Sequence, residues 1–187
     1  MSFDARPRWS LRARALCAAL ALLGAALGVG TGAHVSAAPV PEEQLKAAFV
    51  FNFAVFTEWP QEALGAGAPI VLCAAPNNAL LPALSQLNDK LVNGHRIALR
   101  EIGASARACH VLVLGQLDRE HWGKIRRELA GATVLTVSDD RAISADGVVI
   151  ALSVEHARVG FDVDMSAARG ARLNLSSKLL RLARSVQ

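Results

Sequence analysis

The chain has 187 residues, of which 52% are hydrophobic and 19% charged, and its formal net charge is +4. Residues 1–37 hold four of the 20 basic side chains and one of the 16 acidic ones, so the remainder carries 16 basic and 15 acidic side chains, a net charge of +1. This near-neutral remainder argues against a nucleic-acid-binding protein, and its length of roughly 150 residues fits one domain with its own core.

Residues 1–37 have the pattern of a secretory signal peptide. Arginines precede an uncharged apolar run from Ala15 to Val29, and Val35-Ser36-Ala37 indicates cleavage after Ala37 or Ala38. The apolar run is about 15 residues long, short of the roughly 20 that a membrane-spanning helix needs. Cys17 lies at the start of this run and does not fit a lipidation site. We expect export from the cytoplasm, with an uncleaved membrane anchor as the alternative.

The segment from Pro41 to Trp59 is predicted to be a helix. Pro41 suits a first helical position, and the acidic pair that follows it suits the positive end of the helix dipole. Apolar residues recur at spacings of three and four, and four of the six phenylalanines lie in this segment. Pro60 is expected to end the helix, and its apolar face is expected to be deeply buried.

Short apolar runs then alternate with helical patterns. Residues 69–74, 109–114 and 133–137 are expected to be buried strands, and residues 96–101 alternate as a further strand. Residues 79–90 and 117–129 have amphipathic helical patterns, the second ended by Gly131. This order of strands and helices predicts a largely parallel sheet with helices on its faces.

The last third of the chain changes character. Residues 148–154 and 159–163 alternate in polarity and predict an antiparallel hairpin at the edge of the sheet. Ser176 is expected to cap a final helix, Lys178 to Arg184, with Leu179, Leu182 and Ala183 facing inward. The expected fold class is α/β: a single domain over residues 41–187, with a mixed β-sheet flanked by helices in an α/β sandwich.

Two cysteines, Cys73 and Cys109, remain beyond the export segment. A pair of cysteines in an exported chain favours a disulfide. If the two strands are parallel neighbours that start level, however, Cys73 lies four residues further along than Cys109, which is too far for a bond. Either the strands are staggered, or the two residues are buried free thiols.

The sequence carries no recognisable catalytic or metal-binding pattern. The histidines show no metal-ligand spacing, and His110, within an apolar run, is expected to be a core histidine. There is no Gly-x-Ser-x-Gly nucleophile motif. Asp139 and Asp140 follow a buried strand, where α/β enzymes place catalytic groups, but helix capping explains them equally well. We expect no metal, no cofactor and no enzymatic activity; a hydrolase using Asp139 is the least favoured alternative.

Several short motifs occur in order along nearly the whole exported chain. The most specific are Asn52-Phe53-Ala54-Val55-Phe56-Thr57-Glu58-Trp59-Pro60 and Ser176-Ser177-Lys178-Leu179-Leu180. Others are Ile70-Val71-Leu72-Cys73, Ala108-Cys109-His110-Val111-Leu112, Val134-Leu135-Thr136-Val137-Ser138-Asp139 and Val159-Gly160-Phe161-Asp162-Val163-Asp164. Together they resemble the YfiR-like family of periplasmic regulatory proteins.

This resemblance implies a non-enzymatic periplasmic protein that binds the sensor domain of an inner-membrane diguanylate cyclase and represses cyclic di-GMP production. An OmpA-like outer-membrane lipoprotein would draw the regulator away, and a homodimer is a further assembly that the family implies. Other members accompany membrane sensor kinases, so a small-molecule-binding accessory protein of such a kinase is the alternative. Cys73 and Cys109 match the inter-strand disulfide pair of the family.

The hairpin edge and the last helix are the expected partner-binding surface, because an exposed edge strand is a natural docking site. The candidate residues are Arg158, Phe161, Asp162, Lys178 and Arg181. Phe161 lies on the apolar side of its strand, so a place in the core is the alternative for it. Lys178, Arg181 and Arg184 recur at a spacing of three, which is typical of a solvated helix face as well as of a surface for an acidic partner.

Overall fold

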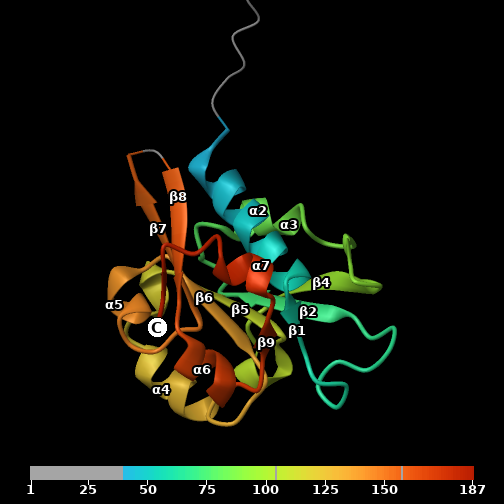
Figure 1. Ribbon diagram of the computed structural model, residues 1–187. Helices are drawn as coiled ribbons and strands as arrows, with labels where there is room; N and C mark the ends of the chain where they lie inside the picture. The colour runs from blue at the N-terminus through green and yellow to red at the C-terminus, as the bar shows by residue number, and fades with distance from the viewer. Residues whose placement is uncertain (1–39, 104, 157) are drawn as a thin grey trace, which may run out of the picture. The chain divides into compact units, whose positions relative to one another are not determined.

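The computed structural model describes residues 40–103, 105–156 and 158–187, and one large mixed sheet organises this part of the chain. The expected export segment, residues 1–37, and its cleavage site lie outside the described residues. The described residues form an eight-stranded sheet in the order β10-β8-β7-β6-β5-β2-β4-β3 and a separate two-stranded sheet, β1-β9 (Figure 1). The expected α/β fold with a mixed sheet and flanking helices is confirmed.

The strands of the large sheet are β2 (Ile70–Ala74), β3 (Leu91–Val92), β4 (His95–Glu101), β5 (Val111–Leu114), β6 (Leu135–Ser138), β7 (Ile150–Glu155), β8 (Arg158–Val163) and β10 (Ser185–Val186). The five from β7 to β4 in the sheet order run parallel. Strands β3 and β8 are antiparallel to their neighbours β4 and β7, and β10 is parallel to β8.

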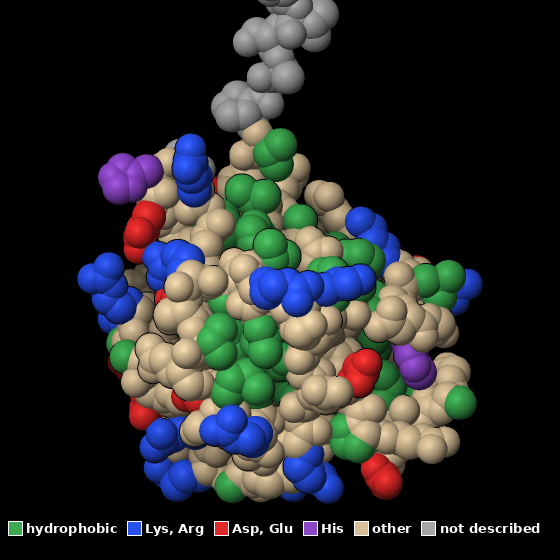
Figure 2. Space-filling model, viewed as in Figure 1, with side chains coloured by type: hydrophobic (Ala, Val, Ile, Leu, Met, Phe, Trp, Pro, Cys, Tyr) green, Lys and Arg blue, Asp and Glu red, His purple; other side chains and the backbone are tan. Residues whose placement is uncertain are grey.

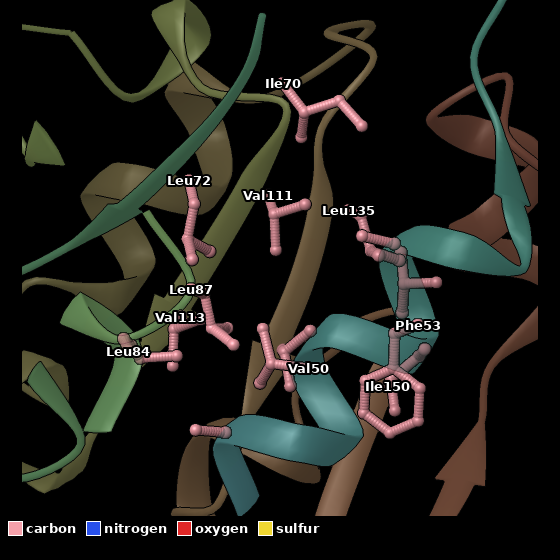
Figure 3. Close-up of a cluster of buried hydrophobic side chains, with 14 of the residues drawn as sticks. Val50, Phe53, Ile70, Leu72, Leu84, Leu87, Val111, Val113, Leu135 and Ile150 are labelled. Atoms are coloured by element: carbon pink, nitrogen blue, oxygen red, sulfur yellow. The ribbon is translucent and has the colours of Figure 1, made fainter. Parts of the chain in front are cut away.

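The central strands β2 and β5 are uninterrupted hydrophobic runs, because a parallel sheet is covered on both sides. One face packs against α2 (Glu42–Val55), α3 (Leu81–Ser85), α6 (Met165–Gly170) and α7 (Ser177–Leu180). Figure 3 shows Val50 and Phe53 of α2 among strand side chains of this cluster such as Val111 and Leu135. The other face packs against α4 (Trp122–Glu128) and α5 (Arg141–Ser144).

The first helix ends at Val55, four residues before the predicted end at Trp59. The hydroxyl of Thr57 donates to the carbonyl oxygen of Phe53 at 2.7 Å and satisfies one carbonyl of the last helical turn. Residues 57–58 then extend as β1 and pair with β9 (Asn174–Leu175), which supplies backbone partners that a longer helix would not need. The prediction of the helix is therefore confirmed, and its end was wrong.

Two other helical predictions were too long. Residues 79–90 form only α3, because Asp89 adopts positive φ where the chain turns into β3. Asn93, also at positive φ, lies in the turn between β3 and β4, which pair with each other. Residues 117–129 divide into the 3₁₀ helix η2 (Gln116–Asp118) and α4. In both cases backbone turns interrupt a pattern that was apolar at helical spacing.

The end of the chain also differs from the prediction. Ser176 caps α7 as expected, and Leu179 is buried, but α7 ends at Leu180 and the chain continues into β10. Leu182, which was expected to face inward, is 69% exposed. Because β10 pairs with the last two residues of β8, only the preceding part of β8 lies at the edge of the sheet.

Candidate functional site

The two most specific sequence motifs meet in space. Strand β1, from the first motif, pairs with β9, which immediately precedes the second, so that Thr57 lies opposite Leu175. The backbone N–H of Ser176 donates to the carbonyl oxygen of Phe56 at 2.9 Å, and Asn174 Nδ2 donates to Glu58 Oε2 at 2.9 Å. The end of α2 therefore holds the start of α7 in place.

Helix α7 and the residue that directly follows it present two basic side chains to solvent. Lys178 and Arg181 are both exposed, and the ion pairs found among the described residues include neither of them. Figure 2 shows Lys and Arg side chains over the position of α7, between groups of apolar side chains. Leu179, on the opposite side of the helix, is 2% exposed and anchors α7 to the core. These two predicted site residues thus lie together on one surface.

The predicted residues of β8 divide between surface and core. Arg158, at the first position of the strand, is exposed. Phe161 is 2% exposed, with its ring centroid 5.0 Å from that of Phe53 and 6.0 Å from that of Phe49. The side chain of Phe161 therefore belongs to the core and is not available to a docking protein.

Asp162 is held by the end of the chain. Arg184 Nη2 donates to Asp162 Oδ2 at 2.6 Å, and the Ser185 hydroxyl donates to Asp162 Oδ1 at 3.0 Å. A second nitrogen of Arg184 donates to Glu155 Oε1 at 2.5 Å, so one guanidinium bridges both strands of the hairpin. Partial burial opposes ionisation of Asp162, but the hydrogen bonds from Arg184 and Ser185 outweigh it and hold its pKa below the ordinary value. We call these four residues the clasp.

A groove of about 540 Å³ lies beside the clasp, between the hairpin and the segment after α7. We call it the hairpin groove; its lining residues are Glu155, His156, Arg158, Val159, Gly160, Leu182 and Arg184. The exposed side chain of Leu182 forms its apolar wall. The groove brings Arg158 together with Arg184, whereas Lys178 and Arg181 are not among its lining residues. Sequence reasoning missed the clasp and Leu182, because a continuous helix was expected there.

A second cleft, also of about 540 Å³, lies on the other side of the hairpin beyond the carboxyl end of β6. Its walls include Asp139, Arg141, Ser153, Asp162 and Arg184. The carboxyl ends of strands are where open α/β sheets usually bind ligands. The hydroxyl of Ser153 is buried without a hydrogen-bond partner among the described residues.

The two aspartates after β6 are both engaged in the structure. Asp140 caps α5 by accepting from the backbone N–H groups of Ala142 and Ile143, as the capping interpretation predicted. Asp139 Oδ2 accepts a hydrogen bond from Lys46 Nζ at 2.7 Å. Lys46 also pairs with Glu42, one turn earlier on α2. Asp139 therefore ties α2 to the end of β6.

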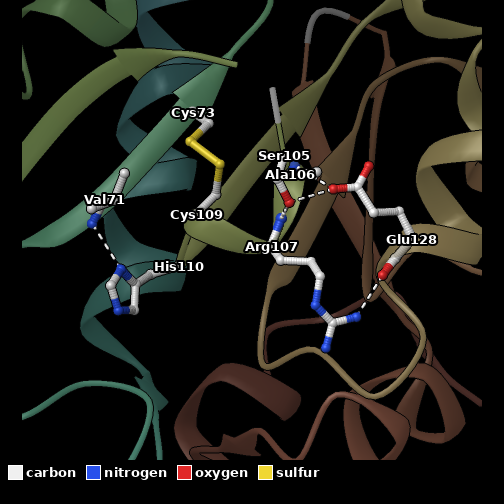
Figure 4. Close-up of a disulfide and its surroundings, with 8 residues drawn as sticks. All are labelled: Val71, Cys73, Ser105, Ala106, Arg107, Cys109, His110 and Glu128. Carbon is white, nitrogen blue, oxygen red and sulfur yellow. Dashed lines mark hydrogen bonds between the residues drawn. A yellow bond between two sulfur atoms is a disulfide. The ribbon is translucent and has the colours of Figure 1, made fainter. Parts of the chain in front are cut away.

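The structure contains the disulfide between Cys73 and Cys109, with the two Cα atoms 5.8 Å apart (Figure 4). Cys73 lies opposite Leu112 in the register of β2 and β5, three residues beyond Cys109, so the strand pairing alone does not bring the two cysteines together. Cys109 lies outside β5, directly after the 3₁₀ helix η1 (Ala106–Ala108), which brings the chain over the sheet face next to Cys73. The bond joins β2 to this connection.

His110 is half-buried, and both of its ring nitrogens have partners within the protein, so it is a satisfied structural histidine but lies less deep than the predicted core position. Its Nδ1 accepts from the backbone N–H of Val71 at 3.0 Å, and its Nε2 lies 3.1 Å from the carbonyl oxygen of Ala63. Burial lowers the pKa of His110 below its ordinary value. In the described ranges no three His, Cys, Asp or Glu side chains group as a metal site would require, and no helix there is long and apolar enough to cross a membrane.

Comparison with known proteins adds two findings. A family model described as YfiR/HmsC-like matches residues 43–184. A crystal structure described as a conserved domain protein from Vibrio cholerae O1 biovar El Tor strain N16961 is similar at 8% sequence identity with a TM-score of 0.49, over 80% of this chain and 62% of that chain. The present chain therefore spans less than two thirds of the Vibrio protein.

Proposed function

Because the chain belongs to the YfiR/HmsC-like family of periplasmic regulators, we propose that it represses an inner-membrane diguanylate cyclase by binding the periplasmic sensor domain of that enzyme. Repression would come from occupancy of the sensor domain and not from turnover of a substrate, and its output would be the level of cyclic di-GMP. The protein would reach the periplasm through cleavage of residues 1–37 near Ala37 or Ala38.

The observation that carries the proposal is the exposed surface of α7 and the hairpin groove. Lys178 and Arg181 have no ion-pair partner among the described residues, and Leu182 beside them is 69% exposed. Exposed apolar patches rimmed by polar residues mark protein interaction sites, and Figure 2 shows groups of apolar side chains on both sides of the Lys and Arg side chains over α7. Arg158 extends this surface along the hairpin groove.

The two remaining candidate residues would stabilise the elements that carry this surface and would not contact the partner. Asp162 acts through the clasp, which holds the end of the chain against β8. Phe161 acts from the core, where it fixes β8 against α2. An OmpA-like outer-membrane lipoprotein that releases the repressor would compete for the same surface, and a homodimer that used it would be mutually exclusive with repression.

The test is capture of the membrane partner. Tagged protein expressed with its export segment is crosslinked in intact cells, purified from the cell envelope, and its bound membrane proteins are identified by mass spectrometry. Recovery of a diguanylate cyclase, with cyclic di-GMP rising when the gene for the present protein is deleted, is the expected result. Recovery of the same proteins with an unrelated tagged periplasmic protein would contradict the proposal.

A small-molecule-binding accessory protein of a membrane sensor kinase is the second candidate. The observation that favours it is the cleft beyond β6, whose volume of about 540 Å³ suits a small ligand and whose Ser153 hydroxyl has no partner among the described residues. A screen of the melting temperature against periplasmic metabolites tests this candidate. A ligand that stabilises the wild type and stabilises Ser153→Ala much less would support it.

A further inference from the structure

Strand β10 is itself a bound peptide segment at the edge of β8. The backbone N–H of Arg184 donates to the carbonyl oxygen of Phe161 at 2.8 Å, and that of Gln187 donates to the carbonyl oxygen of Val163 at 2.9 Å. Ser185 and Val186 lie parallel to Asp162 and Val163. The edge of β8 is therefore shaped to accept an extended strand through backbone hydrogen bonds.

Little apolar burial holds this strand in place. Leu179 is the last buried apolar side chain of the chain, while Leu182 and Val186 are 69% and 45% exposed. The remaining contacts are the clasp and one hydrogen bond that the backbone N–H of Met165 donates to the carbonyl oxygen of Gln187 at 2.8 Å. The charged groups of the clasp are accessible to solvent: Arg184 is 39% exposed and Glu155 66% exposed in their side chains. Exposed ion pairs contribute little to stability, and segments without buried apolar contacts open locally at low cost.

Release of β10 would leave a site with definite chemistry. The carbonyl groups of Phe161 and Val163 would lose their donors, and the carboxylates of Glu155 and Asp162 would lose the guanidinium between them. The side chain of Arg184 lies directly over Gly160, since a Cβ built at position 160 would be 2.7 Å from Arg184 Cδ. Release of β10 would therefore uncover the backbone of β8 at this glycine. The matching occupant is an extended segment with a basic side chain where Arg184 now lies.

We propose that β10 is displaceable and that a partner protein adds an extended, basic segment to the edge of β8 in its place. This inference rests on the proposed function, since it names the way in which the membrane partner would engage the hairpin. Addition of a strand to a sheet edge gains affinity from backbone hydrogen bonds, while the two carboxylates select an Arg or Lys at one position. The parallel pairing of β10 with β8 sets the direction of the incoming strand.

A labelled peptide with the sequence of residues 181–187 tests strand acceptance without any knowledge of the partner. Its binding to the purified exported protein is followed by fluorescence anisotropy for the wild type, for Arg184→Ala, and for a tethered variant, Asp162→Cys with Ser185→Cys. The two positions are suited to a tether because their present side chains already touch at 3.0 Å. A second tether, Leu91→Cys with Arg96→Cys, joins β3 to β4 at the opposite edge and is the matched control. Peptide mapping verifies that each tether and the Cys73–Cys109 bond have formed.

The peptide is expected to bind Arg184→Ala about fivefold more tightly than the wild type, because the protein's own strand then lacks the clasp that the peptide restores. The β10 tether is expected to abolish binding, and the β3 tether to leave it unchanged. A peptide carrying Arg184→Ala should bind more weakly to the wild type and to the Arg184→Ala protein. Absence of binding to Arg184→Ala, or full binding to the β10-tethered protein, would overturn the proposal.

Envelope capture separates this inference from the proposed function. If the β10-tethered protein captures the same membrane partner as the wild type, strand addition is wrong and the proposed function stands. If the peptide experiment succeeds but wild-type capture recovers no signalling protein, β8 accepts strands and the proposed function is wrong. Loss of partner capture by the β10 tether alone, with the β3 tether behaving as wild type, is the result that supports both.

Discussion

The backbone N–H of Val71 donates a hydrogen bond to Nδ1 of His110 across 3.0 Å (Figure 4). An imidazole can accept such a bond only when that nitrogen carries no proton, and Nε2 must then be the protonated nitrogen that donates to the carbonyl oxygen of Ala63. The neutral ring thus links β2, the start of β5 and the loop after Trp59. Protonation would turn the accepting nitrogen into a donor that faces another donor.

Stability is therefore expected to depend on pH near neutrality. Burial lowers the pKa of His110 in the folded protein below the value of about 6.5 that it has when unfolded. Its contribution is complete above pH 6.5 and is lost as pH falls from there towards the folded pKa, because the unfolded state binds the proton first. Urea unfolding between pH 5.5 and 7.5 measures this slope. In His110→Asn an amide oxygen replaces Nδ1 without titrating, so this variant should be less stable but lack the slope, and a slope equal to that of the wild type would contradict the assignment.

Gly160 and Arg184 are expected to be energetically coupled. The Cβ of an alanine at position 160 would lie 2.7 Å from Arg184 Cδ, so the long side chain must move and weaken its bonds to Glu155 and Asp162. Alanine in a strand gains about 0.5–1 kcal/mol over glycine, so Gly160→Ala should stabilise the protein once Arg184 is replaced by alanine and should fail to do so in the wild type. A double-mutant cycle by chemical unfolding should give a coupling of about 1 kcal/mol.

Gly123→Ala is the control for this cycle. Gly123 lies in α4, where an added Cβ would meet only Arg127 Nη1 at 3.7 Å, an ordinary contact. The substitution should stabilise by about 0.5–1 kcal/mol whether or not Arg184 is present. Equal effects of the two glycine substitutions in both backgrounds would show that Arg184 does not rest on Gly160.

The central sheet was predictable from sequence because its strands are buried on both faces, so residues such as Leu72 and Leu112 lie in uninterrupted apolar runs. The ends of α2 and α7 were not. Each is set by a two-residue strand whose partner lies far away in the chain: Thr57 pairs with Leu175, and Ser185 with Asp162. Local periodicity carries no information about such pairings, so the pattern predicts a helix through β1 in the first case and up to Arg184, the residue before β10, in the second.

The candidate site was predictable only where the local sequence pattern determines it. Exposed basic residues on α7 follow from the local pattern and its Ser176 cap, and Lys178 lies where expected. The clasp could not be predicted, because Arg184 was placed on a helix and not beside β8. The exposure of Leu182 follows from the same error, since only a continued helix would have turned this side chain inward.

Loss of the disulfide is expected to lower stability substantially. Cys73 and Cys109 are 2% and 4% exposed and lie 36 residues apart in sequence. Closing a loop of this size stabilises by about 4 kcal/mol on the chain-entropy model, which corresponds to roughly 10 °C in melting temperature for a domain of this size. Cys73→Ser and Cys109→Ser should both show this loss by calorimetry and should accumulate less in the periplasm. Reduction of the wild type breaks the disulfide but keeps both cysteine side chains, so it measures the effect of the bond alone. Equal melting temperatures of reduced and oxidised wild type would contradict the prediction.

Phe161 is expected to act through stability and not through direct contact with a partner. Its ring packs on Phe53 and Phe49, and truncation would leave a cavity between β8 and α2. Phe161→Ala should therefore cost about 3–5 kcal/mol in the free energy of unfolding. Phe161→Leu fills much of the same space and should retain partner capture at temperatures where the variant is folded. Loss of capture by a fully folded Phe161→Leu variant would instead indicate a direct role for the ring.

Charge reversal on α7 gives the most direct test of the proposed surface. Lys178→Glu and Arg181→Glu remove two exposed cations that have no ion-pair partner among the described residues, so folding stability should change by less than about 0.5 kcal/mol. An acidic partner surface would then face like charges, and the double variant should lose envelope capture of the membrane protein about tenfold or more. Arg100→Glu is the matched control, since Arg100 is equally exposed but lies on β4, towards the opposite edge of the sheet. If all three reversals reduce capture alike, net charge and not the surface of α7 governs binding. If the α7 variant captures as well as the wild type, the partner docks elsewhere and the hairpin groove alone remains as its candidate site.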